Sequence, residues 1–104
     1  MIIYNVTINV TDNAHEDWLY WMRNEHIPAM LATGKFTKAL MSTVLVKEDT
    51  GGTSYSVQYT ASSRGHLDRY LEEDAKTMSA ASEHFKDEVV SFRTELEVVT
   101  EQSL

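Results

Sequence analysis

The residue best suited to acid–base chemistry is His26, which follows Glu25 and lies two positions before Pro28. Histidine titrates near neutral pH, so His26 can act as a general base or as a hydrogen-bonding group for a ligand. A second interpretation is structural. Proline has no N–H and leaves a carbonyl free in the preceding turn, to which the His26 imidazole can donate. The sequence leaves both interpretations open.

Aromatic side chains are the second component of a candidate site. The chain has 2 Trp, 5 Tyr and 3 Phe, and Tyr4, Trp18, Trp21 and Tyr59 are expected to form the walls of a pocket for a flat apolar ligand. Such residues are more often simply part of the core, and this alternative applies also to three further aromatic side chains, Tyr55, Tyr70 and Phe92.

The sequence predicts neither a metal site nor a cofactor. It contains no Cys, which excludes disulfides, thiol catalysis and thiolate-bound metals. His15 and His26 are separated by about 16 Å along a straight helix, too far to share a metal ion. We expect His15 to pack at a helix start, and His66 and His84 to lie on the solvent side of a second helix.

Most of the acidic residues have a structural explanation and need no catalytic role. The run 72–74 fits an exposed helix surface, and Glu95 and Glu97 fit cross-strand pairing around Arg93. Asp74 is the exception, because it falls on the apolar side of its helix and is a secondary candidate for acid–base work.

The charge and length of the chain exclude several classes of function. Its 104 residues contain 9 Lys and Arg against 16 Asp and Glu, a net charge of −7, and one domain spanning 1–104 is expected. Nucleic-acid binding requires a basic surface, so we expect none. The N-terminus has no cationic segment and no apolar run approaches the ~20 residues needed to cross a bilayer, so we expect a cytoplasmic protein without membrane contact.

Periodicity predicts the elements that must position these residues. Residues 2–11 alternate as a strand, with Ile2, Tyr4 and Val6 on one side and Asn5 and Thr7 on the other. Alternation also predicts strands over 37–47, 54–60 and 89–100, with a polar glycine turn at 48–53. In the last strand, we expect the apolar set Val90, Phe92, Leu96 and Val98 to face the helices.

Two helical regions separate these strands. The first begins at Asn13, a predicted N-cap with Glu16 completing a capping box, and its packed face contains His15, Trp18, Leu19, Met22, His26 and Ala29. Pro28 predicts an interruption near His26 and Ile27, with a short helix over 28–33 ending at Gly34. The second spans about 63–86, capped by Ser62 or Ser63, with a break near 75–77.

The predicted order β-α-β-β-α-β is a ferredoxin-like α+β fold, a four-stranded antiparallel sheet with two helices on one face. We call the opposite side of the sheet the rear face. Its short uncharged residues, such as Asn5, Thr7 and Ser56, and a second strand that is apolar on both sides, are unusual for a surface in water. We therefore predict a two-fold homodimer.

The segment from Trp18 to Phe36, with Glu25-His26-Ile27-Pro28 at its centre, resembles the dimeric α/β-barrel superfamily. The strands around Tyr55 to Tyr59 and Phe92 to Thr94 resemble a small bacterial family of unknown function within it. This resemblance implies the fold and the dimer but no established activity. Thr33 departs from the proline that is common before Gly34 in EthD-like proteins.

The wider superfamily includes EthD-like proteins, cofactor-independent monooxygenases, muconolactone isomerases, chlorite dismutase relatives and haem-degrading enzymes, so the fold does not select a reaction. Haem degradation is disfavoured because the strand ending at Tyr59 has no Trp and His84 is out of phase, although Asn5 fits. Two hypotheses remain: a small-molecule binding protein or cofactor-independent enzyme using His26, and a non-catalytic dimeric interaction or regulatory module.

Overall fold

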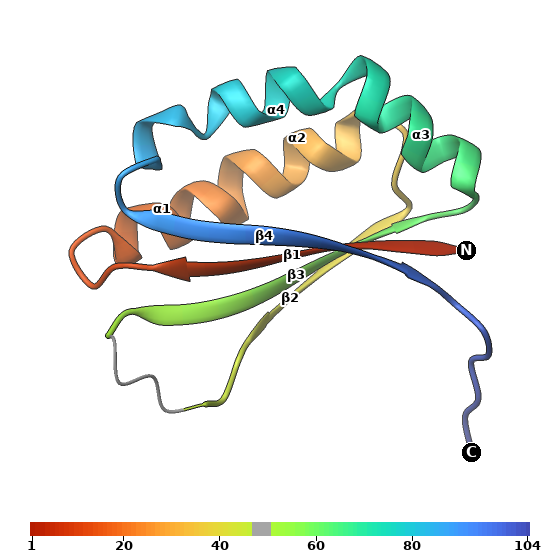
Figure 1. The fold of residues 1–104 in the computed structure, drawn as a ribbon, viewed down its shortest axis with the longest axis horizontal. Coiled ribbons are helices and arrows are strands. Elements are labelled where there is room, and N and C mark those ends of the chain that lie inside the picture. Colours follow the sequence, from red (N-terminus) through yellow and green to blue (C-terminus); the bar gives the residue numbers. More distant parts are fainter. Residues whose placement is uncertain (47–50) are drawn as a thin grey trace.

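The computed structural model describes residues 1–46 and 51–104. Its sheet is antiparallel with strand order β2-β3-β1-β4, and its helices all cover one face (Figure 1). The elements in chain order are β1 (Ile2–Val10), α1 (His15–Trp21), η1 (Met22–His26), α2 (Ile27–Ala32), β2 (Lys38–Thr43), β3 (Thr53–Ala61), α3 (Arg64–Glu73), α4 (Ala75–Ala81), η2 (Glu83–Phe85) and β4 (Val89–Glu97). The predicted ferredoxin-like fold is confirmed.

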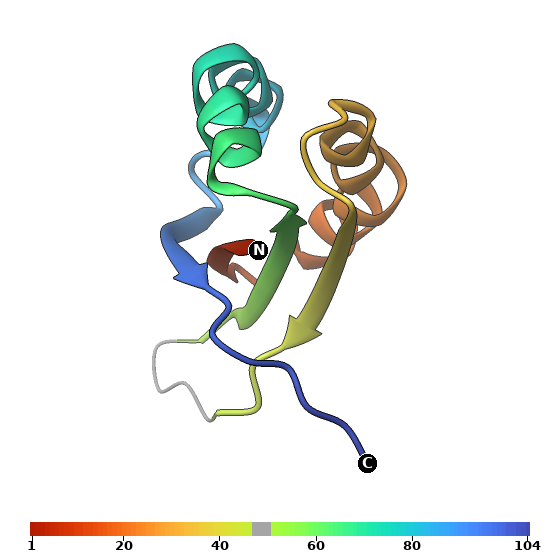
Figure 2. The ribbon, with the colours of Figure 1, turned by 90° about the vertical axis from the view of Figure 1, so that its right-hand side faces the viewer.

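The helices form two rows above the sheet. Figure 2 shows the row from α1 to α2 on the side of β2 and the row from α3 to α4 on the side of β4. Between the rows and the sheet lies the core, whose largest fully buried side chains are Trp18, Tyr59, Leu67, Val10 and Val57. Burial of such side chains is the main source of stability in a domain of this size.

The central strand β1 behaves as its alternation predicts. Its residues pair with β3 on one side and with β4 on the other along the whole strand. Ile2, Tyr4, Ile8 and Val10 are buried beneath the helices, because side chains two residues apart lie on the same side of a strand.

The edge strand β4 is turned over relative to the prediction. Arg93 is opposite Val6 and Glu95 is opposite Tyr4, so Arg93 and Glu95 lie on the helix side. The prediction that the apolar set faces the helices is wrong. Val90, Phe92 and Leu96 lie on the rear face and are 75%, 61% and 40% exposed. Pairing register with β1, which alternation does not contain, decides which set faces the helices.

Several element boundaries also differ from the predictions. Strand β2 ends at Thr43 and strand β4 at Glu97, both shorter than expected. The predicted turn at 48–53 lies partly outside the described residues, but Gly51 and Gly52 have φ values of +82° and +75°, as a glycine turn requires. The second helical region breaks at Asp74, close to the predicted position, and its last turn is 3-10.

Helix ends follow the sequence at three places and depart from it at one. Ser63 accepts from the backbone N–H of His66 at 3.3 Å, and Gly34 has φ +78° at the end of α2, both as predicted. The interruption near Ile27 is also confirmed, since α2 begins there. The Asn13 cap is wrong, because α1 begins after Ala14 without a side-chain cap.

Candidate functional site

A cavity of about 110 Å³ lies between the sheet and the two helix rows. Six aromatic side chains contribute to its wall, and His26 is part of the lining. The aromatic residues are Tyr4, Trp18, Trp21, Tyr59, Tyr70 and Phe85. The structure therefore brings His26 together with all four aromatic residues that the sequence singled out as walls.

A wide helical turn carries His26 to this cavity. In η1 the chain makes a π turn, in which the N–H of Ile27 donates to the carbonyl of Met22, five residues earlier. Pro28 follows at the start of α2, where its missing N–H is best tolerated. Met22 and His26 are four residues apart, on the same side of the helix, and both line the cavity. Such π turns are frequent at functional sites.

The His26 ring is positioned by an aromatic stack. It lies against Trp21 with ring centroids 4.5 Å apart and planes at 22°. The other neighbours of Trp21 are Phe85 at 5.3 Å and the edge of His84 at 5.4 Å. In the described part of the chain no group hydrogen-bonds to the His26 imidazole. The hydrogen bond to a carbonyl at the kink is thus not formed with any described residue.

Burial favours the neutral forms of His26 and of three tyrosines in the cavity. Desolvation, followed by the charge of Arg93, lowers the pKa of His26, so its imidazole is unprotonated at neutral pH. Desolvation raises the pKa of Tyr59 and of Tyr70. It also raises the pKa of Tyr4, against the opposing charge and hydrogen bond of Arg93.

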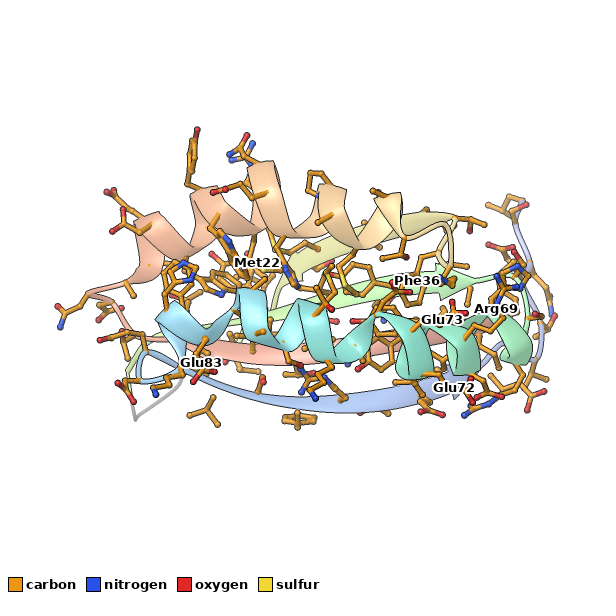
Figure 3. All side chains as sticks on the ribbon, turned by 90° about the horizontal axis from the view of Figure 1, so that it is seen from above. Met22, Phe36, Arg69, Glu72, Glu73 and Glu83 are labelled. Atoms are coloured by element: carbon orange, nitrogen blue, oxygen red, sulfur yellow. The ribbon has the colours of Figure 1, made fainter. Side chains whose placement is uncertain are left out.

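The cavity opens between α4 and β4. Most of its lining residues are buried or half-buried, and the exposed ones are Ser79 on α4 with Ser91 and Arg93 on β4. Figure 3, seen from above, shows Met22 and Phe36 between the helix rows, with Glu72 and Glu83 on the outer side of the α3 to α4 row. Glu72 and Glu83 therefore point away from the core.

The secondary candidates lie outside the cavity. Asp74 is engaged by Lys35, whose Nζ lies 2.9 Å from Asp74 Oδ2 and 2.9 Å from Glu73 Oε2. This pair of contacts ties the loop after α2 to the junction of α3 and α4. His15 hydrogen-bonds the Tyr55 hydroxyl at 2.6 Å and packs on its ring, consistent with the packing role expected from sequence.

Within residues 1–46 and 51–104, no cluster of three His, Asp or Glu side chains is placed to hold a metal ion. No helix in these ranges has the length and apolar character of a membrane span.

A family model described as Domain of unknown function (DUF4286) matches residues 1–99. The chain belongs to this family. No curated protein matches it. The match agrees with the predicted resemblance to a family of unknown function.

Solved structures similar to this DUF4286 chain share its fold. A dimeric ferredoxin-like protein from an uncultured marine organism has TM-score 0.74 and 12% identity, covering 97% of each chain. An EthD family protein from Bacillus halodurans C-125 has TM-score 0.67 and 11% identity, covering 93% of this chain and 100% of the other. SnoaB, a cofactor-independent oxygenase from Streptomyces nogalater, has TM-score 0.68 and 10% identity, covering 96% and 94%. The predicted resemblance is confirmed for the fold.

Sequence reasoning missed part of the DUF4286 cavity and misplaced two residues. Arg93 was assigned to the rear face and instead lines the cavity, whereas Phe92 was considered as a wall and lies on the rear face. Phe85 also lines the cavity, although nothing in the sequence singles it out as a site residue. The register of β4 against β1 is the information that would have placed the first two correctly.

Proposed function

We propose that this DUF4286 protein binds a small planar molecule with one aromatic ring in the cavity between sheet and helices. His26 is its hydrogen-bonding or acid–base group, and Tyr4, Trp18, Trp21 and Tyr59 are its walls. The observation that carries this proposal is the convergence of six aromatic side chains and an imidazole without a described hydrogen-bond partner on one cavity. Such cavities, apolar with a few polar groups, are typical of ligand sites.

The size of the cavity limits the ligand. An apolar cavity of about 150 Å³ holds benzene, and this one has about 110 Å³ with an open side between α4 and β4. One ring therefore enters, while any substituent stays at the mouth near Ser79 and Ser91.

The neutral His26 imidazole can act on a bound ligand in two ways. It can donate one N–H to a ligand oxygen, and its unprotonated nitrogen can accept a proton from an acidic ligand group. The first of these roles is ligand binding without a reaction. The second is an acid–base transformation without a cofactor. SnoaB, which has a similar fold, is a cofactor-independent oxygenase.

We also propose that two copies of the chain associate through their rear faces. Val90, Phe92 and Leu40 are 75%, 61% and 60% exposed there, more apolar surface than a monomer usually leaves in water. Similar solved structures are described as dimeric ferredoxin-like proteins, which supports the same arrangement. A dimeric module without a ligand is the function that remains if the cavity binds nothing.

Thermal unfolding with benzamide, a neutral single-ring probe, tests the ligand proposal. At ten times its dissociation constant a ligand adds about 1.4 kcal/mol, which raises Tm by about 5–10 °C in a domain of this size. Ser79→Phe fills the mouth of the cavity and should abolish the shift. Ala80→Phe, the next and also exposed residue of α4, should not.

Two results contradict the ligand proposal. If benzamide does not raise the Tm of the unmodified protein, the cavity does not bind it. If benzamide raises the Tm of Ser79→Phe by the same amount, the probe binds outside the cavity. For the dimer, sedimentation of the unmodified protein should give twice the 11.9 kDa chain mass, and a particle of one chain mass would contradict it.

A further inference from the structure

The cavity contains one charged side chain. Among its described lining residues Arg93 is the sole cation at neutral pH, because His26 is unprotonated, and none is a carboxylate. This is unexpected in a chain of net charge −7. The charge of the cavity is thus opposite in sign to that of the protein as a whole.

Arg93 has no ionic partner among the described residues. The ion pairs there join Lys35, Arg64 and Lys86 to carboxylates. Glu95, two residues along the same side of β4, is held by Arg64 of α3. Glu97 is four residues from Arg93, about 13 Å along a strand. The guanidinium hydrogen-bonds the Tyr4 hydroxyl inside the cavity and has no described carboxylate to neutralise it there.

We infer that the ligand of this cavity is an organic anion, an aromatic ring bearing one carboxylate, whose oxygens are bound by Arg93 at the mouth while the ring lies beside Trp21. The inference rests on the proposed function and names the ligand class of that site. A guanidinium presents two parallel N–H groups that match the two oxygens of a carboxylate. Charge-assisted hydrogen bonds of this kind are the strong ones in proteins.

The single cation also limits the charge of the ligand. One carboxylate is neutralised by Arg93, whereas a phosphate ester or a dicarboxylate brings a second negative charge into a protein that is already acidic. The remaining polar groups of the lining, among them the Tyr4 hydroxyl and the His26 ring, are neutral. They can donate hydrogen bonds to a carboxylate but do not neutralise another charge.

Three probes of nearly the same shape distinguish the effect of ligand charge on affinity from the effect of ligand shape. At neutral pH benzoate is an anion, benzamide is neutral and benzamidine is a cation. We expect the affinity of the unmodified protein, measured by protein-observed NMR titration, to fall in that order, with benzoate bound about 10- to 100-fold more tightly than benzamide, as expected for a hydrogen bond to a charged group.

Variants of Arg93 identify the group responsible. Arg93→Gln should lower benzoate affinity to that of benzamide and leave benzamide unchanged, whereas Arg93→Lys should keep part of the preference because the charge remains. Arg69→Gln makes the same change of net charge at an exposed position of α3 that does not line the cavity, and should keep the full preference.

The outcomes separate the inference from the proposed function. Equal affinity for benzoate and benzamide in the unmodified protein, or an unchanged benzoate preference in Arg93→Gln, would overturn the anion inference while leaving cavity binding in place. Failure of all three probes to bind would overturn the proposed function and this inference with it. The NMR spectrum of each variant reports whether it is folded.

Discussion

Replacing Phe92 with Ala should dissociate the proposed dimer. Phe92 lies on the rear face of β4 opposite Thr7 and is 61% exposed in the isolated chain. A partner chain on that face would cover this ring and its symmetry mate. Few other residues leave so large an apolar group in water, so its removal should weaken association without disturbing the core.

The expected loss follows from the area. A Phe side chain has about 200 Å² of surface, so 61% exposure corresponds to about 120 Å² for each chain and about 240 Å² for two. At about 25 cal/mol per Å² this area is worth about 6 kcal/mol. Area converts incompletely into affinity, because association also orders side chains. A loss of about 3–6 kcal/mol, or about 10²- to 10⁴-fold in dissociation constant, is therefore expected.

Sedimentation velocity over a series of protein concentrations measures this change. The unmodified protein should sediment as a dimer of 11.9 kDa chains, and Phe92→Ala should approach the monomer as it is diluted. Tyr20→Ala is the matched control, since Tyr20 is a 66% exposed aromatic residue on α1, in the helix layer of the fold. It should leave the dissociation constant unchanged.

Two results would refute this reasoning. If Phe92→Ala has the dissociation constant of the unmodified protein, the rear face is not the interface. If Tyr20→Ala dissociates the dimer instead, the helix layer forms the contact, and the exposed side chains of β4 need another explanation.

Three further predictions concern pH and stability. Because the pKa of His26 is lowered in the folded state, the unfolded chain binds a proton at this residue first as pH falls below 6.5, and the free energy of unfolding decreases. Urea unfolding at a series of pH values should show this decrease in the unmodified protein and a smaller one in His26→Gln. Parallel curves for the two proteins would contradict the lowered pKa. Leu67→Ala, at a fully buried position of α3, should cost about 2–5 kcal/mol in urea unfolding. Leu71→Ala on the same helix, at 39% exposure, should cost clearly less, and equal costs would mean that the core is misplaced. Gly52→Ala should lower Tm more than Gly51→Ala, because both have positive φ but only at Gly52 would the new methyl group lie 2.7 Å from a backbone carbonyl oxygen; equal losses would count against that close approach.

Local features of the fold could be predicted from the sequence because their causes are local. The alternation of β1 identifies which residues share a side, whatever the rest of the chain does. Ser63 caps its own helix, Gly34 adopts a positive φ where α2 ends, and Pro28 accompanies the interrupted helix that brings His26 to the cavity. Each of these depends on residues within about one turn.

Two other predictions differ from the structure for different reasons. Asn13 is a good capping residue by type, but the N–H groups of Ala14 and His15 donate to the carbonyls of the turn before them, and α1 begins after Ala14. Asp74 lies at a helical position typical of the core, and the loop residue Lys35, 39 positions away, forms an ion pair with it. Only this second outcome depends on residues far away in the sequence.

The clearest division concerns the two sides of β4. Its sequence by itself determined that Arg93 and Glu95 share one side and that Val90 and Phe92 share the other. Only the register against β1, with Arg93 opposite Val6, decided that the cation faces the cavity and the apolar pair faces outward. The physical reason is that a two-residue repeat is unchanged when a strand is turned over, so its orientation is chosen by the pairing of backbone groups far apart in the chain.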